Sequence, residues 1–200
     1  MRILLLNQFY LPDVAATGQL LADLAEDLVR HGHEVHVICS RRGYNGGGET
    51  YPVTEAIQGV QIHRVRACGF GRGRAVGRVC DWLSFYLLAM VKAFRLPKMD
   101  VCVALTTPPF IALIGVMLNR LRKTRLLVWS MDMYPEVPAA FGVLSSRCRV
   151  YRFLSWLSGC IYRRCSAVIS LGEFMTQRLQ GAGVPAEKIC TVHNWVPREA

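Results

Sequence analysis

The chain has 200 residues, enough for one large domain or two small ones, and 52% of them are hydrophobic, which excludes an intrinsically disordered chain. Its net charge of +10 favours an anionic partner such as a nucleic acid, an acidic membrane surface or a phosphate-bearing substrate. A basic surface that is merely solvated would give the same charge balance.

The cysteines and the apolar runs indicate in which compartment the protein lies and whether a metal site is expected. The eight cysteines include no C-x-x-C pair and no zinc-type spacing, so we expect reduced thiols and no metal site. The apolar run at residues 3–6 is too short for the core of a signal peptide. The run at residues 110–118 is too short to cross a bilayer. We therefore expect no transmembrane helix and a cytoplasmic location.

Short apolar runs of strand-forming residues alternate with amphipathic segments along the whole chain. The predicted strands are at residues 2–6, 34–39, 60–65, 100–105, 125–130, 166–171 and 188–194. The predicted helices are at residues 17–32, 79–96, 109–122, 146–164 and 173–183. In the first helix we expect Thr17 as the N-cap and Gly32 as the glycine just past the C-terminus.

This alternation predicts an α/β fold, a Rossmann-like doubly wound domain with a mostly parallel sheet of about seven strands and helices on both faces. Ligands of such sheets bind outside the carboxyl ends of the strands. The loops at residues 7–18, 67–78, 106–109, 130–142 and 170–173 are therefore expected to face the site.

Two common functions of this fold, dinucleotide-dependent redox chemistry and P-loop nucleotide hydrolysis, are disfavoured because their motifs are missing. The loop after the first strand has one glycine, Gly18, instead of G-x-G-x-x-G, and the later GFGRGRAVG stretch does not complete that motif either. No G-K-[ST] sequence is present, so a P-loop is absent. Backbone N–H groups at Gly18 and Gln19 remain candidates for contact with a phosphate at the start of the first helix.

Three stretches carry a resemblance to a known family: ILLLNQFYLPDVAATGQLLADLAEDLVRHGHEVHVIC, WSMDMYPE and ICTVHNWV. Their order and spacing resemble the amino-terminal domain of family 4 glycosyltransferases of the GT-B fold. The similarity is strongest to the bacterial branch that makes capsule, O-antigen and colanic-acid-type polysaccharides, and it spans residues 2–197. Many members of that family have Gly-Gly where this chain has Thr17-Gly18.

The resemblance implies an acceptor-side domain at residues 1–195, one half of a GT-B fold, with residues 196–200 beginning an interdomain linker. The donor-binding domain, which carries the family's E-x₇-E pattern, is expected to lie outside these 200 residues. The complete enzyme would transfer a sugar from a nucleotide-sugar to a lipid-linked saccharide in surface polysaccharide synthesis, with retention and without a metal or another cofactor. It would lie at the inner face of the cytoplasmic membrane, and this chain alone is expected to be inactive.

The resemblance also implies a cleft and a catalytic residue. Asp132 matches the family's D-x-x-P-E segment, where a carboxylate can take a proton from an acceptor hydroxyl or hold a hydroxyl of the donor sugar. Apolar neighbours are expected to raise its pKa by desolvation. A helix-capping or salt-bridged aspartate is the alternative. The other residues expected at the acceptor and donor cleft are Gln8, Tyr10, Thr17, Gly18, Tyr134, Glu136, Arg72, Arg74 and Asn194.

Several of these residues have a second interpretation that the sequence leaves open. An ordinary turn glycine is the alternative for Gly18. Glu136 either binds the acceptor or caps a short helix at residues 137–141. Arg72 and Arg74 either grip an acceptor pyrophosphate or lie in a solvated loop. Asn194 either contacts a substrate or positions a hinge.

The stretch RCRVYRFLSWLSGCIYRRC, residues 147–165, mixes arginines with aromatic residues on one amphipathic segment. This composition suits the headgroup region of an anionic membrane, although a core-packed helix with exposed arginines is the alternative. Two further hypotheses remain for the whole chain. One is a non-catalytic acceptor- or membrane-binding subunit of a split glycosyltransferase. The other is a basic nucleic-acid-binding domain, which is disfavoured because no nucleic-acid motif is present.

Overall fold

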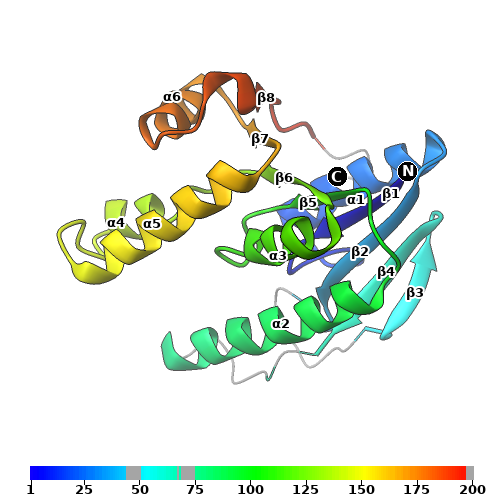
Figure 1. Cartoon of the computed structure of the whole chain (residues 1–200). Coiled ribbons are helices and arrows are strands. Elements are labelled where there is room, and N and C mark those ends of the chain that lie inside the picture. Colours follow the sequence, from blue (N-terminus) through cyan, green and yellow to red (C-terminus); the bar gives the residue numbers. More distant parts are fainter. Residues whose placement is uncertain (44–50, 67, 69–74, 197–200) are drawn as a thin grey trace.

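The computed structural model describes residues 1–43, 51–66, 68 and 75–196, and it contains one mixed sheet of eight strands (Figure 1). The strand order is β3-β4-β2-β1-β5-β6-β7-β8. The strands are β1 (Arg2–Leu6), β2 (Glu34–Ser40), β3 (Thr54–Ile57), β4 (Val60–Val65), β5 (Val101–Ala104), β6 (Arg125–Trp129), β7 (Ala167–Ser170) and β8 (Ile189–Thr191). The helices are α1 (Ala16–Arg30), α2 (Ala75–Arg95), α3 (Ala112–Arg122), α4 (Glu136–Ala140), α5 (Arg149–Arg164) and α6 (Glu173–Gly181), with a 3-10 helix, η1 (Ala186–Lys188).

The seven predicted strands are all present and parallel to one another, so the α/β Rossmann-like prediction is confirmed. The sequence missed β3, which pairs antiparallel with β4 at the edge of the sheet. The two strands are joined at Gln58 and Gly59, which both have positive φ, as a tight hairpin turn requires. β3 is partly exposed along its length and has no apolar run, which is why its sequence gives a weak strand signal.

Alternate residues of the central strand β1 supply two separate core layers. Leu4 and Leu6 belong to the layer that contains Phe85 of α2, Ile114 of α3 and Ile161 of α5. Ile3 and Leu5 belong to the layer beneath α1, with α1 residues such as Leu21 and Ala25. The alternation follows from the two-residue period of a strand. Helices therefore cover both faces of the sheet, as predicted.

Several helix ends differ from the predicted ones. The N-cap of α1 is Ala15, which makes no side-chain capping bond, so the prediction for Thr17 is wrong. Gly32 has a φ of 79° directly after α1, which confirms its predicted role at the helix end. α3 begins at Ala112 rather than at Pro109, because Phe110 has a φ of 63° and interrupts the helical backbone.

Two residue classes complete the description of the interior. All eight cysteines are free thiols, as expected. His36 is buried on β2 and stacks on His63 with ring centroids 5.3 Å apart. Burial lowers the pKa of His63 to about 4.

Among the helices that the structure describes, none combines the length and the apolar character needed to cross a bilayer.

Candidate functional site

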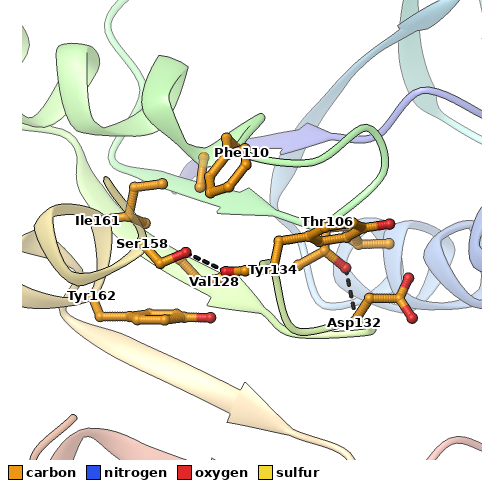
Figure 2. Close-up of a pocket in the computed structure, with 10 residues that line it drawn as sticks. Thr106, Phe110, Val128, Asp132, Tyr134, Ser158, Ile161 and Tyr162 are labelled. Carbon is orange, nitrogen blue, oxygen red and sulfur yellow. Dashed lines mark hydrogen bonds between the residues drawn. The ribbon is translucent and has the colours of Figure 1, made fainter. Parts of the chain in front are cut away.

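The turn after β6 lies at the carboxyl edge of the sheet and carries Asp132 (Figure 2). Its backbone is held by Thr106, which follows the neighbouring strand β5. The Thr106 Oγ1 accepts hydrogen bonds from the N–H groups of Met131 at 3.2 Å and of Asp132 at 3.0 Å. Ser130, which is fully buried, adds a longer bond of 3.4 Å from its hydroxyl to the Asp132 carbonyl oxygen. Two hydroxyl side chains therefore fix the position of this carboxylate.

The Asp132 side chain is half-buried, and desolvation raises the pKa of its carboxyl group, as its apolar neighbours led us to expect. The carboxylate makes no ion pair within the described part of the chain. It does not cap α4 either, because the N-cap of that helix is Pro135. A carboxylate that is partly desolvated and lacks a cationic partner is suited to accept a proton.

Tyr134 connects the same turn to α5. Its carbonyl oxygen accepts a hydrogen bond from the Ser158 hydroxyl, and its ring lies 6.2 Å from that of Phe110 between centroids. Burial, followed by the negative charge of Asp132, raises the pKa of Tyr134. In Figure 2 the Asp132 carboxylate points away from Ser158 and Tyr162.

A small cavity lies behind the Asp132 turn. Its volume is about 30 Å³, which is room for about two water molecules, so it is too small for a sugar. It is lined by Leu105, Thr106, Phe110, Ala112, Val128, Asp132, Tyr134, Ser158, Ile161 and Tyr162. Burial raises the pKa of Tyr162 to about 12, against a smaller opposing effect of its hydrogen bond with Ser130. The tyrosine is therefore neutral over the physiological pH range.

A wider groove adjoins this cavity and shares Ser158 and Tyr162 with it. It lies between α5 and α6, has a volume of about 380 Å³, and contains Glu136 from the first turn of α4 and Arg178 from α6. A groove of this size and mixed charge has room for part of a polar ligand. Tyr134 and Asp132 therefore line the small cavity, and Glu136 lines the adjoining groove.

The loop after β1 is packed more tightly than the sequence suggested. Gly18 is buried, and a Cβ atom at this position would lie 3.2 Å from the carbonyl carbon and oxygen of Phe9. The glycine is therefore needed for the close approach of the loop to α1. The N–H groups of Gly18 and Gln19 both donate to the Ala15 carbonyl oxygen, at 2.8 and 3.1 Å. They are not available to a phosphate, so that part of the prediction is wrong.

The remaining predicted cleft residues fall into different environments. Gln8 ties three strand ends together through its backbone, since its N–H donates to Thr107 and its carbonyl oxygen accepts from Ser40, both at 2.8 Å. Thr17 is half-buried and its hydroxyl accepts from the Asn7 amide at 3.4 Å. Tyr10 is only 3% exposed and belongs to the core layer beneath α1, where burial raises its pKa. Its side chain does not face an open cleft.

Asn194 is exposed after β8, between two residues with clear contacts. His193 Nδ1 lies 2.9 Å from the Leu171 carbonyl oxygen. Trp195 donates from Nε1 to Asp23 of α1 at 2.8 Å and stacks on Trp129, with centroids 5.6 Å apart. Arg72 and Arg74 lie outside the described residues.

Comparison with protein families assigns the chain. Residues 16–195 match the family described as "Glycosyl transferase 4-like domain". The chain belongs to the glycosyl transferase 4-like family. A search of curated proteins found no match.

Solved structures similar to this glycosyl transferase 4-like chain have low sequence identity and show the shared fold. The Anabaena protein Alr3699/HepE, solved with UDP and glucose, gives a TM-score of 0.59 at 17% identity. The UDP-GlcNAc 2-epimerase from Methanocaldococcus jannaschii gives 0.56 at 14%, and the lipopolysaccharide outer core galactosyltransferase WaaB gives 0.56 at 8%. The matches cover 97–98% of this chain but only 45–46% of the other chains, so it spans a little under half of their length.

In this glycosyl transferase 4-like chain, sequence reasoning missed Thr106, Ser130 and Ser158 as residues that hold the Asp132 turn. For Thr106 and Ser130 a signal exists, because both directly follow apolar strand runs at the carboxyl edge of the sheet. Ser158 lies within α5, and only the packing of that helix brings it to Tyr134.

Proposed function

We propose that this chain is the acceptor-side domain of a glycosyltransferase that moves a sugar from a nucleotide-sugar to a lipid-linked saccharide in surface polysaccharide synthesis. The observation that carries the proposal is the half-buried Asp132 carboxylate, which has a raised pKa and no ionic partner among the described residues. HepE, solved with UDP and glucose, and the galactosyltransferase WaaB support a nucleotide-sugar donor and a saccharide acceptor. No further cofactor is required by this reaction.

The proposed chemistry gives Asp132 one defined role. The oxygen of an acceptor hydroxyl forms the new bond to the anomeric carbon of the donor, while the bond from that carbon to the nucleoside diphosphate breaks. The acceptor proton goes to the Asp132 carboxylate, whose raised pKa makes it a stronger base than an ordinary aspartate. Glu136 and Arg178 line the neighbouring groove, where they would bind polar groups of the acceptor.

The outer part of α5 supports a location at an anionic membrane surface. Only Ile161 and Tyr162 of this helix are buried, and its other residues are partly or fully exposed, which favours a surface role over the alternative of a core-packed helix. Phe153 and Trp156 stack on each other, with centroids 5.9 Å apart, and both are exposed beside arginines. Figure 1 shows α5 reaching beyond the sheet. Exposed aromatic and basic side chains suit the headgroup region at the inner face of the cytoplasmic membrane.

Two binding measurements on this chain test the proposal. We expect it to bind nanodiscs that contain a polyprenyl-pyrophosphate saccharide more tightly than nanodiscs of the same lipids without it. We expect no micromolar binding of UDP-glucose in calorimetry, because the donor would bind mainly to another domain. Equal binding to both nanodiscs would contradict the acceptor, and micromolar donor binding would contradict the acceptor-side assignment. Normal transfer by Asp132→Asn, with a donor-binding half supplied, would favour a non-catalytic subunit.

A further inference from the structure

Helix α2 is apolar on the side that faces away from the sheet as well as on the side that packs against it. Phe85, Ala89 and Ala93 are buried in the core. Roughly opposite them, at four-residue spacing, are Val79, Leu83, Leu87 and Val91, whose side chains are between 39% and 61% exposed. A surface helix normally presents charged and polar residues on its outward side. α2 therefore has an outward apolar stripe that stays exposed among the residues that the structure describes.

The charged residues of α2 whose side chains the structure describes do not interrupt this stripe. These are Asp81, Lys92 and Arg95, and their spacings of eleven and three residues place them along one flank of the helix, together with Ser84. The stripe from Val79 to Val91 spans about 18 Å at 1.5 Å per residue. An uncharged arc of this length suits contact with an apolar surface and does not suit contact with water.

The neighbouring helix α3 extends the apolar surface. It packs beside α2 and exposes Met117 and Leu121, one helical turn apart. Arg122 of α3 donates from Nη1 to the Leu96 carbonyl oxygen at 2.8 Å and also bonds to the Phe94 carbonyl oxygen. These bonds join the carboxyl-terminal end of α2 to that of α3.

Positive charge surrounds one end of this apolar surface. The described basic residues near the carboxyl-terminal ends of α2 and α3 are Lys92, Arg95, Lys98, Arg120, Arg122, Lys123 and Arg125. The described acids on the same elements and their connections are Asp81 and Asp100. An apolar stripe bordered by an excess of Lys and Arg matches an anionic bilayer, which offers acyl chains beneath negative headgroups.

We propose that the outward face of α2 and α3, formed by Val79, Leu83, Leu87, Val91, Met117 and Leu121, inserts into the surface of an anionic lipid bilayer. The helices then lie in the plane of the membrane and do not cross it. α5 packs on the same core layer as α2 and α3, so its exposed aromatic residues lie on the same side of the sheet. The inference rests on the membrane location in the proposed function, and it assigns the apolar part of the membrane contact to α2 and α3.

Flotation with lipid vesicles tests this inference. The wild-type chain is expected to bind vesicles of phosphatidylethanolamine and phosphatidylglycerol. The double variant Leu83→Gln/Leu87→Gln is expected to bind at least about tenfold more weakly, since two leucines no longer enter the acyl region. Phe174→Gln is the matched control, because Phe174 on α6 is 72% exposed and lies outside the proposed surface. Its binding is expected to equal that of the wild type, and circular dichroism checks that each variant is folded.

Other outcomes separate this inference from the proposed function. Unchanged binding of Leu83→Gln/Leu87→Gln, with binding lost in Phe153→Gln/Trp156→Gln, would overturn the role of α2 and leave the α5 contact intact. A wild-type dimer in sedimentation that becomes monomeric in Leu83→Gln/Leu87→Gln would also overturn it, because a second copy would then cover the stripe. Loss of the nanodisc preference for the polyprenyl-linked saccharide, with α2-dependent flotation retained, would sink the proposed acceptor and support this inference.

Discussion

The loops that follow β1 and β6 lie at the same edge of the sheet, but their polar groups have different partners. At residues 7–18 the Asn7 amide donates to the Phe9 carbonyl oxygen at 2.8 Å, and the first N–H groups of α1 turn back to Ala15. At residues 130–136 the backbone is held by Thr106 and Ser158 from other elements, and the Asp132 carboxylate has no ionic partner in the part of the chain that the structure describes. The first loop is built for packing, and the second one leaves a group available for chemistry.

The largest expected effect is a difference in the rate of sugar transfer between a variant of the second loop and a variant of the first. Asp132→Asn is expected to lower the rate of sugar transfer about 100-fold or more, because a general base is lost while the shape is retained. Tyr10→Phe, in the first loop, is expected to change the rate less than about twofold, since its side chain is in the core. Rates are measured with a donor-binding half supplied. A large loss of transfer rate in Tyr10→Phe would indicate that this residue does contribute to the cleft.

The next effect concerns stability and belongs to the first loop. Gly18→Ala is expected to lower the free energy of unfolding by about 1–3 kcal/mol, because the new methyl group would crowd the Phe9 carbonyl group. Urea denaturation gives the value. Gly181→Ala is the matched control, since a Cβ there meets no atom within 4 Å, and it is expected to change stability by less than about 0.5 kcal/mol. Equal effects at both positions would contradict the close-packing account of the first loop.

A smaller effect tests how the second loop is held. Thr106→Val removes the oxygen that accepts two N–H groups, so the Asp132 turn is expected to loosen and transfer to fall about tenfold. Thr106→Ser keeps the oxygen and is expected to restore most of the rate. The loss should appear in kcat more than in KM, because Thr106 positions the base without contacting the acceptor. A serine variant as poor as the valine variant would show that the methyl group matters instead.

The smallest expected effect is the pH dependence of folding stability that the Asp132 carboxyl group causes. Burial raises the pKa of the folded carboxyl group above its unfolded value, so the folded state binds the proton more tightly. The stability contribution of this group therefore falls as the pH rises through the ordinary carboxyl range toward the folded pKa. Asp132→Asn is expected to be slightly more stable than wild type at neutral pH, with no gain below a pH of about 3.8, as urea midpoints would show. A larger gain in acid than at neutral pH would contradict the direction of the shift.

The sequence was sufficient for the features that depend on local pattern. The alternation of apolar runs predicted the seven parallel strands, and the strand-end rule placed Asp132 at the ligand-binding edge. The edge strand β3 was not predicted, because its side chains are partly exposed and form no apolar run. The interpretation of Tyr10 and of the Gly18 N–H groups failed for another reason. Whether a loop residue faces the core or the solvent is decided by contacts between segments, such as that of Phe9 with Gly18, which no local pattern contains.

The shared use of β1 has a consequence for how the protein unfolds. Leu4 and Leu5 are adjacent in the chain, yet they belong to core layers on opposite faces of the sheet. A strand that detaches from one layer also detaches from the other, so neither layer can melt while its counterpart persists. We therefore expect fluorescence and circular dichroism to report a single coincident unfolding transition for this chain.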